Sequence, residues 1–149
     1  MEISGTLGAI LQHKDTHTWS IGPDATVYEA IALMAEKGIG ALPVMTGKKL
    51  VGMFSERDYT RKVVLKGRSS KQTPVMEIMT REVVIAAPGD AVADCLRLMT
   101  EQRVRHLPVM EREEMLGIVS IGDLVKWIIS AQNATIDQLT KYVFGDYSP

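Results

Sequence analysis

The chain has 149 residues, of which 46% are hydrophobic and 23% are charged, and its formal net charge is −1. This composition is typical of a soluble globular domain, and the near-zero charge argues against duplex DNA as a partner. A single cysteine excludes an internal disulfide bond, and no apolar run reaches the roughly 20 residues of a membrane-spanning helix. The amino terminus does not have the pattern of a secretory signal peptide. We therefore expect a cytoplasmic protein with no membrane or nucleic-acid partner.

The first half of the chain predicts a short helix, then a helix, a hairpin and a second helix. The short helix is expected at residues 4–12, and an extended stretch at residues 18–21 leads to a Gly-Pro turn. From Thr26 to Gly38 apolar residues recur at helical spacing, and Thr26 forms a capping box with Glu29. The two hairpin strands and the second helix follow at residues 41–45, 50–54 and 55–65.

The second half repeats this order. A strand, a helix, two hairpin strands and a second helix are expected at residues 83–86, 91–102, 107–110, 115–119 and 120–131. A separate last helix is predicted from Thr135, as its N-cap, to Phe144, with Gly145 just beyond its end. The predicted division is a helical segment, a first repeat, a connector, a second repeat and a C-terminal helix with its tail, at residues 1–14, 15–67, 68–75, 76–131 and 132–149.

The two halves are related by a repeat in the sequence. Residues 23–58 align with residues 88–123 without a gap, and 12 of these 36 positions are identical. Self-similarity at one fixed spacing indicates a structural repeat. We therefore predict a mixed α/β (α+β) fold in which two similar lobes face each other about a pseudo-twofold axis. The identical pairs include Pro43 and Pro108, Gly52 and Gly117, Ser55 and Ser120, and Asp58 and Asp123.

The repeated motif Gly-x-x-Ser-x-x-Asp, which follows the last strand of each half, has two interpretations. In the structural one, Ser and Asp form a capping box that satisfies the free amides at the start of a helix. In the functional one, that helix start attracts an anion, and the Asp accepts hydrogen bonds from a ribose. The Gly would then leave room for a flat ring to approach the backbone. The motif alone favours capping, but the two interpretations are compatible.

Three motifs recur in order in both halves: Pro-x-x-x-Val, Leu-Pro-Val, and Gly-h-h-Ser-x-x-Asp, where h is apolar. With these motifs, residues 15–131 resemble two copies of the cystathionine-β-synthase-type (CBS) domain, a pair known as a Bateman module. The resemblance implies a small β-sheet with two helices in each repeat. It also implies that the clefts between repeats bind AMP, ADP, ATP or another adenosine-containing molecule such as NAD. The module would be a regulatory homodimer that acts on a separate effector protein and needs no catalytic cofactor.

The resemblance assigns the repeated polar residues to the sugar and the phosphates. Asp58 and Asp123 would accept hydrogen bonds from ribose hydroxyls, and Ser55 and Ser120 would touch ribose or phosphate. Members of the family often carry a Thr three residues before the first Pro. Ser20 keeps a hydroxyl at this position.

Other residues are assigned to the adenine and the phosphates. Ala41 and His106 would offer backbone groups to the adenine edge. Arg105 and His106 match the basic pair that precedes Leu-Pro in nucleotide-sensing relatives, and Arg57 would meet phosphate. The first repeat lacks this basic pair, and the second has Ile85 where Ser20 has its hydroxyl. The resemblance therefore implies two sites that differ.

One alternative to a nucleotide site remains at this point. The repeats may serve only folding, in which case the chain is a structural or protein-interaction module without a ligand. His13 and His17 have the spacing of a zinc pair, but no cysteine cluster accompanies them, so we expect no metal. The sequence contains neither a Gly-x-Ser-x-Gly motif nor a Gly-rich phosphate loop, so we expect no enzyme activity.

Overall fold

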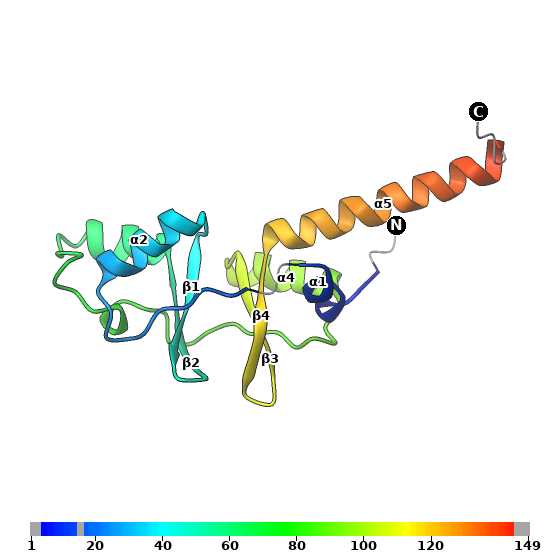
Figure 1. The fold of residues 1–149 in the computed structure, drawn as a ribbon. Coiled ribbons are helices and arrows are strands. Elements are labelled where there is room, and N and C mark those ends of the chain that lie inside the picture. Colours follow the sequence, from blue (N-terminus) through cyan, green and yellow to red (C-terminus); the bar gives the residue numbers. More distant parts are fainter. Residues whose placement is uncertain (1–3, 15–16, 145–149) are drawn as a thin grey trace.

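The structure is a computed structural model that describes residues 4–14 and 17–144. Two antiparallel hairpins stand side by side at its centre, and one long helix extends away from the body (Figure 1). The elements are α1 (Leu7–His13), α2 (Val27–Lys37), β1 (Ala41–Thr46), β2 (Lys49–Ser55), α3 (Glu56–Asp58), the π-helix η1 (Tyr59–Val64), the 3₁₀ helix η2 (Val75–Glu77), α4 (Val92–Gln102), β3 (His106–Glu111), β4 (Glu114–Ser120) and α5 (Ile121–Phe144).

The two hairpins confirm the predicted repeat. β1 pairs with β2 from Ala41 opposite Ser55, and β3 pairs with β4 from His106 opposite Ser120. Both registers shift at the same place, after Val44 in the first hairpin and after Val109 in the second. The mixed fold with two small antiparallel sheets is therefore the one predicted.

The strand predicted at residues 83–86 is wrong. Ala86 makes a single parallel bridge to Val109, and its counterpart Ile21 makes one to Val44. To extend these ladders, the next backbone amide would have to come from Pro23 in the first half and from Pro88 in the second. A proline has no amide hydrogen to donate. Each stretch therefore pairs through one residue and goes no further.

The helix boundaries are confirmed in part. The capping box of Thr26 and Glu29 is present at α2, and Gly38 ends that helix in the left-handed conformation at φ 65°. The predicted helix after Ser55 begins as α3 and continues as η1. The predicted break before Thr135 is wrong, because α5 runs through it as one helix of 24 residues. No proline or glycine occurs between Gly122 and the end of α5 to stop it. Gly145 lies outside the described residues.

Each repeat is completed by the segment that precedes the other one. In the core of the second repeat, Leu7 and Ile10 of α1 pack with residues from Ala86 to Leu124. In the core of the first repeat, Val75 and Ile78 pack with residues from Val27 to Val63. The backbone bonds match, because Gly8 donates to the Pro88 carbonyl at 2.8 Å and Met76 donates to the Pro23 carbonyl at 3.0 Å. The two repeats are therefore interlocked, each with its own core completed by a segment from outside that repeat.

The two segments that complete the cores, α1 and residues 75–80, are called the exchanged segments below. They explain the repeated glycines. A Cβ atom placed on Gly52 would lie 2.6 Å from Met79 Sδ and 2.9 Å from the Thr80 carbonyl oxygen. One placed on Gly117 would lie 3.0 Å from Leu11 Cδ2. The room at these glycines is thus filled by the chain itself, and the expectation that it serves a flat ligand ring is wrong.

Among the residues that the structure describes, no helix is both long and apolar enough to cross a bilayer.

Candidate functional site

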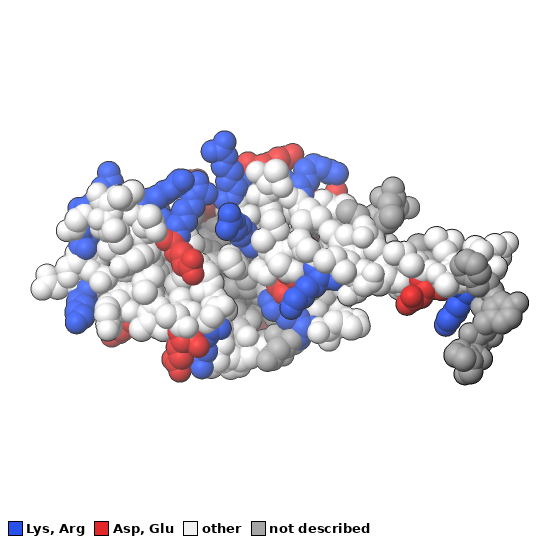
Figure 2. Space-filling model, turned by 90° about the horizontal axis from the view of Figure 1, so that it is seen from above, with Lys and Arg blue, Asp and Glu red and all other residues white. Residues whose placement is uncertain are grey.

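A cleft of about 680 Å³ lies between the two repeats. Its walls come from the starts of β1 and β3, the end of β2 with the helix that follows it, the segment after η2, and the end of α4. Figure 2 shows Lys and Arg side chains gathered around a hollow on one face of the molecule. The residues that line the cleft are Gly40, Ala41, Met53, Ser55, Glu56, Arg57, Asp58, Arg61, Lys62, Thr80, Glu82, Val83, Val84, Gln102, Arg103, Val104, Arg105 and His106.

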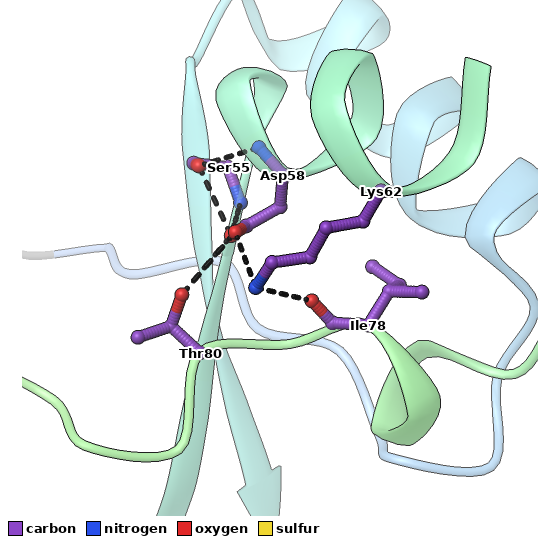
Figure 3. Close-up of polar contacts among 5 residues, drawn as sticks. All are labelled: Ser55, Asp58, Lys62, Ile78 and Thr80. Carbon is purple, nitrogen blue, oxygen red and sulfur yellow. Dashed lines mark hydrogen bonds and ion pairs between the residues drawn. The ribbon is translucent and has the colours of Figure 1, made fainter. Parts of the chain in front are cut away.

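The Asp58 carboxylate lies in the wall of the cleft and is only 8% exposed. Figure 3 shows its polar contacts. The predicted capping box is present: Asp58 Oδ2 accepts from the Ser55 amide at 3.0 Å, and Ser55 Oγ accepts from the Asp58 amide at 3.2 Å. Thr80 Oγ1 donates to Asp58 Oδ1 at 3.2 Å, and Lys62 Nζ lies 3.0 Å from the same oxygen. Lys62 also donates to the Ile78 carbonyl at 3.1 Å. The acid of the first repeat is therefore held by its own helix and by the exchanged segment.

Positive side chains outnumber negative ones around the cleft. The lining contains five Lys or Arg side chains against three Asp or Glu side chains. Arg57, from the first repeat, donates from Nη1 to the carbonyl of Arg103, in the second repeat, at 2.9 Å. Arg103 ends α4 in the left-handed conformation at φ 54°, which turns the chain toward the cleft. The cleft is thus an anion-attracting space bridged by one hydrogen bond between the repeats.

The second repeat holds its acid in a different way. Asp123 Oδ2 accepts from the Ser120 amide at 2.8 Å and from Lys14 Nζ at 2.6 Å. Lys14 also donates to the Ile118 carbonyl at 2.7 Å. Burial raises the pKa of Asp123, but the hydrogen bonds from Lys14 and Ser120 outweigh it and hold that pKa below its ordinary value. At the repeat position of Lys62 stands Trp127, so the cation for Asp123 comes from beyond α1 instead.

His106 contributes no full positive charge to the predicted basic pair. Burial and the charge of Lys14 lower the pKa of its ring, and Asp123 and Glu56 offset this only in part. Because the ordinary value is 6.5, the ring is mostly neutral at pH 7. The pair of Arg105 and His106 therefore carries one charge.

The structure brings six of the nine predicted site residues together and leaves three apart. Ala41, Ser55, Arg57, Asp58, Arg105 and His106 line the cleft. Ser20, Ser120 and Asp123 are not among its lining residues.

Sequence reasoning missed Thr80, which donates to Asp58. It falls within the predicted second repeat but contacts the first, and no local pattern signals that exchange.

Metal and nucleophile candidates are accounted for by other contacts. His13 Nδ1 lies 2.8 Å from the Ala9 carbonyl oxygen, and the His13 ring packs edge-on against Trp127 at 5.9 Å. Within residues 4–14 and 17–144, no three His, Cys, Asp or Glu side chains group closely enough to hold a metal ion. Burial, with Asp90 and Asp94 nearby, raises the pKa of Cys95 to about 11, so its thiol stays protonated.

The proteins that this chain resembles have one type of domain in common. The family model of the CBS domain matches residues 15–65 and 75–130. A mitochondrial CBS domain-containing protein of Arabidopsis thaliana is 40% identical over 83% of this chain, which spans 63% of that protein's length. A solved structure from Burkholderia ambifaria, described as a signal-transduction protein with CBS domains, is 48% identical with a TM-score of 0.83; the match covers 86% of this chain and 96% of that one. A hexameric CBS-CP12 protein from bloom-forming cyanobacteria is 30% identical with a TM-score of 0.72, over 82% of this chain and 71% of that one. With two matched copies of its domain in tandem, this chain belongs to the CBS domain family.

Proposed function

We propose that this chain is a regulatory module that binds an adenine nucleotide, such as AMP, ADP or ATP, in the cleft between its repeats. CBS domain pairs in general are regulatory and either bind adenosine ligands or mediate interactions. One observation carries the proposal for this chain: the acid Asp58 lies in the wall of a cleft of about 680 Å³ whose lining has an excess of cations. A nucleotide combines a diol, which an acid binds, with an anionic tail, which cations bind.

Each part of the nucleotide has a matching surface in the cleft. The ribose hydroxyls would donate to Asp58 and displace the hydrogen bond from Thr80. The phosphates would meet Arg57 and its neighbours on the basic rim. The purine would lie against apolar lining such as Val84 and Val104, with its edge toward the backbone at Ala41. NAD contains the same adenosine group and is the other ligand to test.

Binding would be coupled to the arrangement of the repeats through Arg57. The Arg57 side chain donates one hydrogen bond to the Arg103 carbonyl of the other repeat. A phosphate that recruits Arg57 competes with that bond and shifts the relative position of the repeats. Such coupling is typically about 1–3 kcal/mol, which is enough to change the affinity of this surface for a second copy of the chain or for a separate effector protein.

Calorimetric titration with AMP, ADP, ATP and NAD tests this function. We expect at least one of them to bind with a dissociation constant below millimolar. Asp58→Asn should weaken that binding at least about tenfold, because the acceptor for the ribose is lost. The matched control is Asp94→Asn, which makes the same change on an exposed helix face where Asp94 pairs with Arg97. The absence of heat for all four ligands would contradict the proposal.

A module without a ligand is the second candidate, and one observation favours it. The carboxylates of Asp58 and Asp123 already accept hydrogen bonds from their own helix starts and from Lys62 and Lys14. In that case these residues serve folding alone, and the protein acts by docking. Thermal melts discriminate the two, since a ligand that binds only the folded state raises the melting temperature. No change of melting temperature with any nucleotide would favour docking.

We further propose that the module is a cytoplasmic homodimer without catalytic activity. The solved hexameric relative self-associates, which supports assembly of this chain with itself. The protonated Cys95 thiol and the capping role of both repeated serines leave no evident nucleophile among the described residues of the repeats. Sedimentation analysis and cell fractionation test the assembly and the compartment.

A further inference from the structure

The outer half of α5 is an arm that projects from the body (Figure 1). Its first turns are anchored, because Leu124 is fully buried and Trp127 Nε1 donates to the Ser4 carbonyl at 2.9 Å. Farther along, every described side chain from Gln132 to Val143 is exposed. Several of these are large and apolar, with Leu139 58% and Val143 66% exposed. The arm therefore gains little burial of apolar surface from the described part of its own chain.

Five exposed apolar side chains of α5, with the polar Gln132 among them, form a stripe with the spacing of a coiled-coil seam. Successive positions are four, three, four, three and four residues apart, as in a heptad repeat. Charged residues stand outside the stripe, so two identical stripes would meet without like-charge repulsion. The stripe spans 18 steps of the helix, which is about 27 Å, and so exceeds two heptads. Its members are Val125, Ile129, Gln132, Ile136, Leu139 and Val143.

An uncovered arm of this kind is only marginally stable in water. Helices of fewer than about 12–15 residues are marginal without tertiary packing, and the exposed part of α5 is of that length. Its composition does not compensate, because Ile, Val, Asn and Thr are weaker helix formers than Ala or Leu. Covering the stripe would therefore stabilise the arm.

We propose that a second copy of this chain covers it, with the two α5 helices paired as a parallel, in-register coiled coil. Ile129, Ile136 and Val143 occupy one seam position, where β-branched side chains are typical of parallel two-stranded coiled coils. The other seam position holds Val125, Gln132 and Leu139. In register, the Gln132 amides of the two copies face each other and can hydrogen-bond. An antiparallel pair would place Gln132 against an isoleucine and leave a buried amide unpaired, which is costly.

This pairing rests on the self-association proposed above but is independent of nucleotide binding. It gives that assembly a surface and an orientation. Nucleotide binding can therefore fail while the coiled coil stands, and the reverse also holds.

Sedimentation of the full chain with two matched variants tests the surface. Leu139→Asp puts a charge into the seam, whereas Gln138→Asp puts the same charge on the neighbouring, outward-facing position. We expect the wild type and Gln138→Asp to be dimers, and the dissociation constant of Leu139→Asp to be at least about 100-fold higher. The melting of the body, which lies away from residue 139, checks that both variants fold. A monomeric wild type, or equal dissociation constants for the two variants, would overturn the proposal.

Disulfide trapping tests the register. The single native cysteine, Cys95, is buried, so the background of cross-linking is low. Under mild oxidation we expect Gln132→Cys to give a covalent dimer, and the outward-facing Asp137→Cys to give none. Failure of Gln132→Cys to cross-link in a dimeric protein would overturn the in-register arrangement.

Discussion

Replacing the two repeated glycines by alanine gives a direct test of the exchanged segments. In Gly52→Ala the new Cβ would lie 2.9 Å from the backbone oxygen of Thr80, which cannot turn away, as well as 2.6 Å from Met79 Sδ. In Gly117→Ala it would lie 3.0 Å from Leu11 Cδ2, the end of a flexible side chain that can. The same substitution should therefore be costly in the first repeat and cheap in the second.

The magnitudes follow from two opposing effects. Overpacking typically costs about 1–3 kcal/mol, whereas Gly→Ala gains about 0.4–1 kcal/mol by restricting the unfolded chain. Neither glycine has a positive φ, so the backbone adds no strain. We expect Gly52→Ala to lose about 1–2 kcal/mol, which corresponds to roughly 2–8 °C in melting temperature for a chain of this size. Gly117→Ala should stay within about 0.5 kcal/mol of the wild type.

Calorimetric or circular-dichroism melts of both variants measure the difference. Equal stability of Gly52→Ala and wild type, or a larger loss in Gly117→Ala, would refute the packing of Met79 and Thr80 against the first hairpin. A Gly52→Ser variant serves as a second check, because a larger side chain at the same contact should cost at least as much as alanine.

The remaining predictions concern three side chains. Lys14→Met should cost about 1 kcal/mol or less at pH 7. Because the folded-state pKa of Asp123 is lowered, the ion pair is fully stabilising above the ordinary carboxyl pKa, and the difference between variant and wild type in urea melts should vanish as the pH falls through the lowered, folded-state pKa. A cost that persists unchanged at pH 2 would contradict the ion pair. Cys95 should resist thiol reagents at pH 8 in the folded protein and react only on unfolding, since burial raises its pKa to about 11; rapid labelling without denaturant would show an open core. Arg57→Ala should weaken calorimetric binding of ATP several-fold and leave adenosine unaffected, and an equal loss for both would remove Arg57 from the phosphate site.

Local sequence patterns were sufficient for the parts of the fold that are held together locally. The capping boxes at Thr26 and Ser55 use residues three apart, and both are present. The hairpins follow from apolar runs separated by a short polar turn, and both are confirmed. The repeat itself gave the pairing of equivalent residues across the two halves.

The parts that sequence reasoning missed depend on contacts between distant segments. Thr80 falls in the predicted second repeat but binds Asp58 of the first. Lys14 lies ahead of the first repeat but binds Asp123 of the second, and nothing in the neighbours of either residue indicates which lobe it joins. The reason for the repeated Gly52 was wrong because the atoms that fill its space come from residues 79 and 80. The neutral ring of His106 depends on its burial, which a sequence pattern of basic residues does not reveal.

The exchange of segments fixes the order in which this protein can be completed during synthesis. The helix α1 leaves the ribosome long before the core in which Leu7 packs is available, because that core includes residues as late as Leu124. The first repeat likewise has to wait for Val75, which comes after its own last helix. A fragment that stops at residue 67 would expose the apolar surface that Val75 and Ile78 cover and would be prone to aggregate. The smallest part of this chain that is expected to fold by itself is therefore the pair of repeats and not a single repeat.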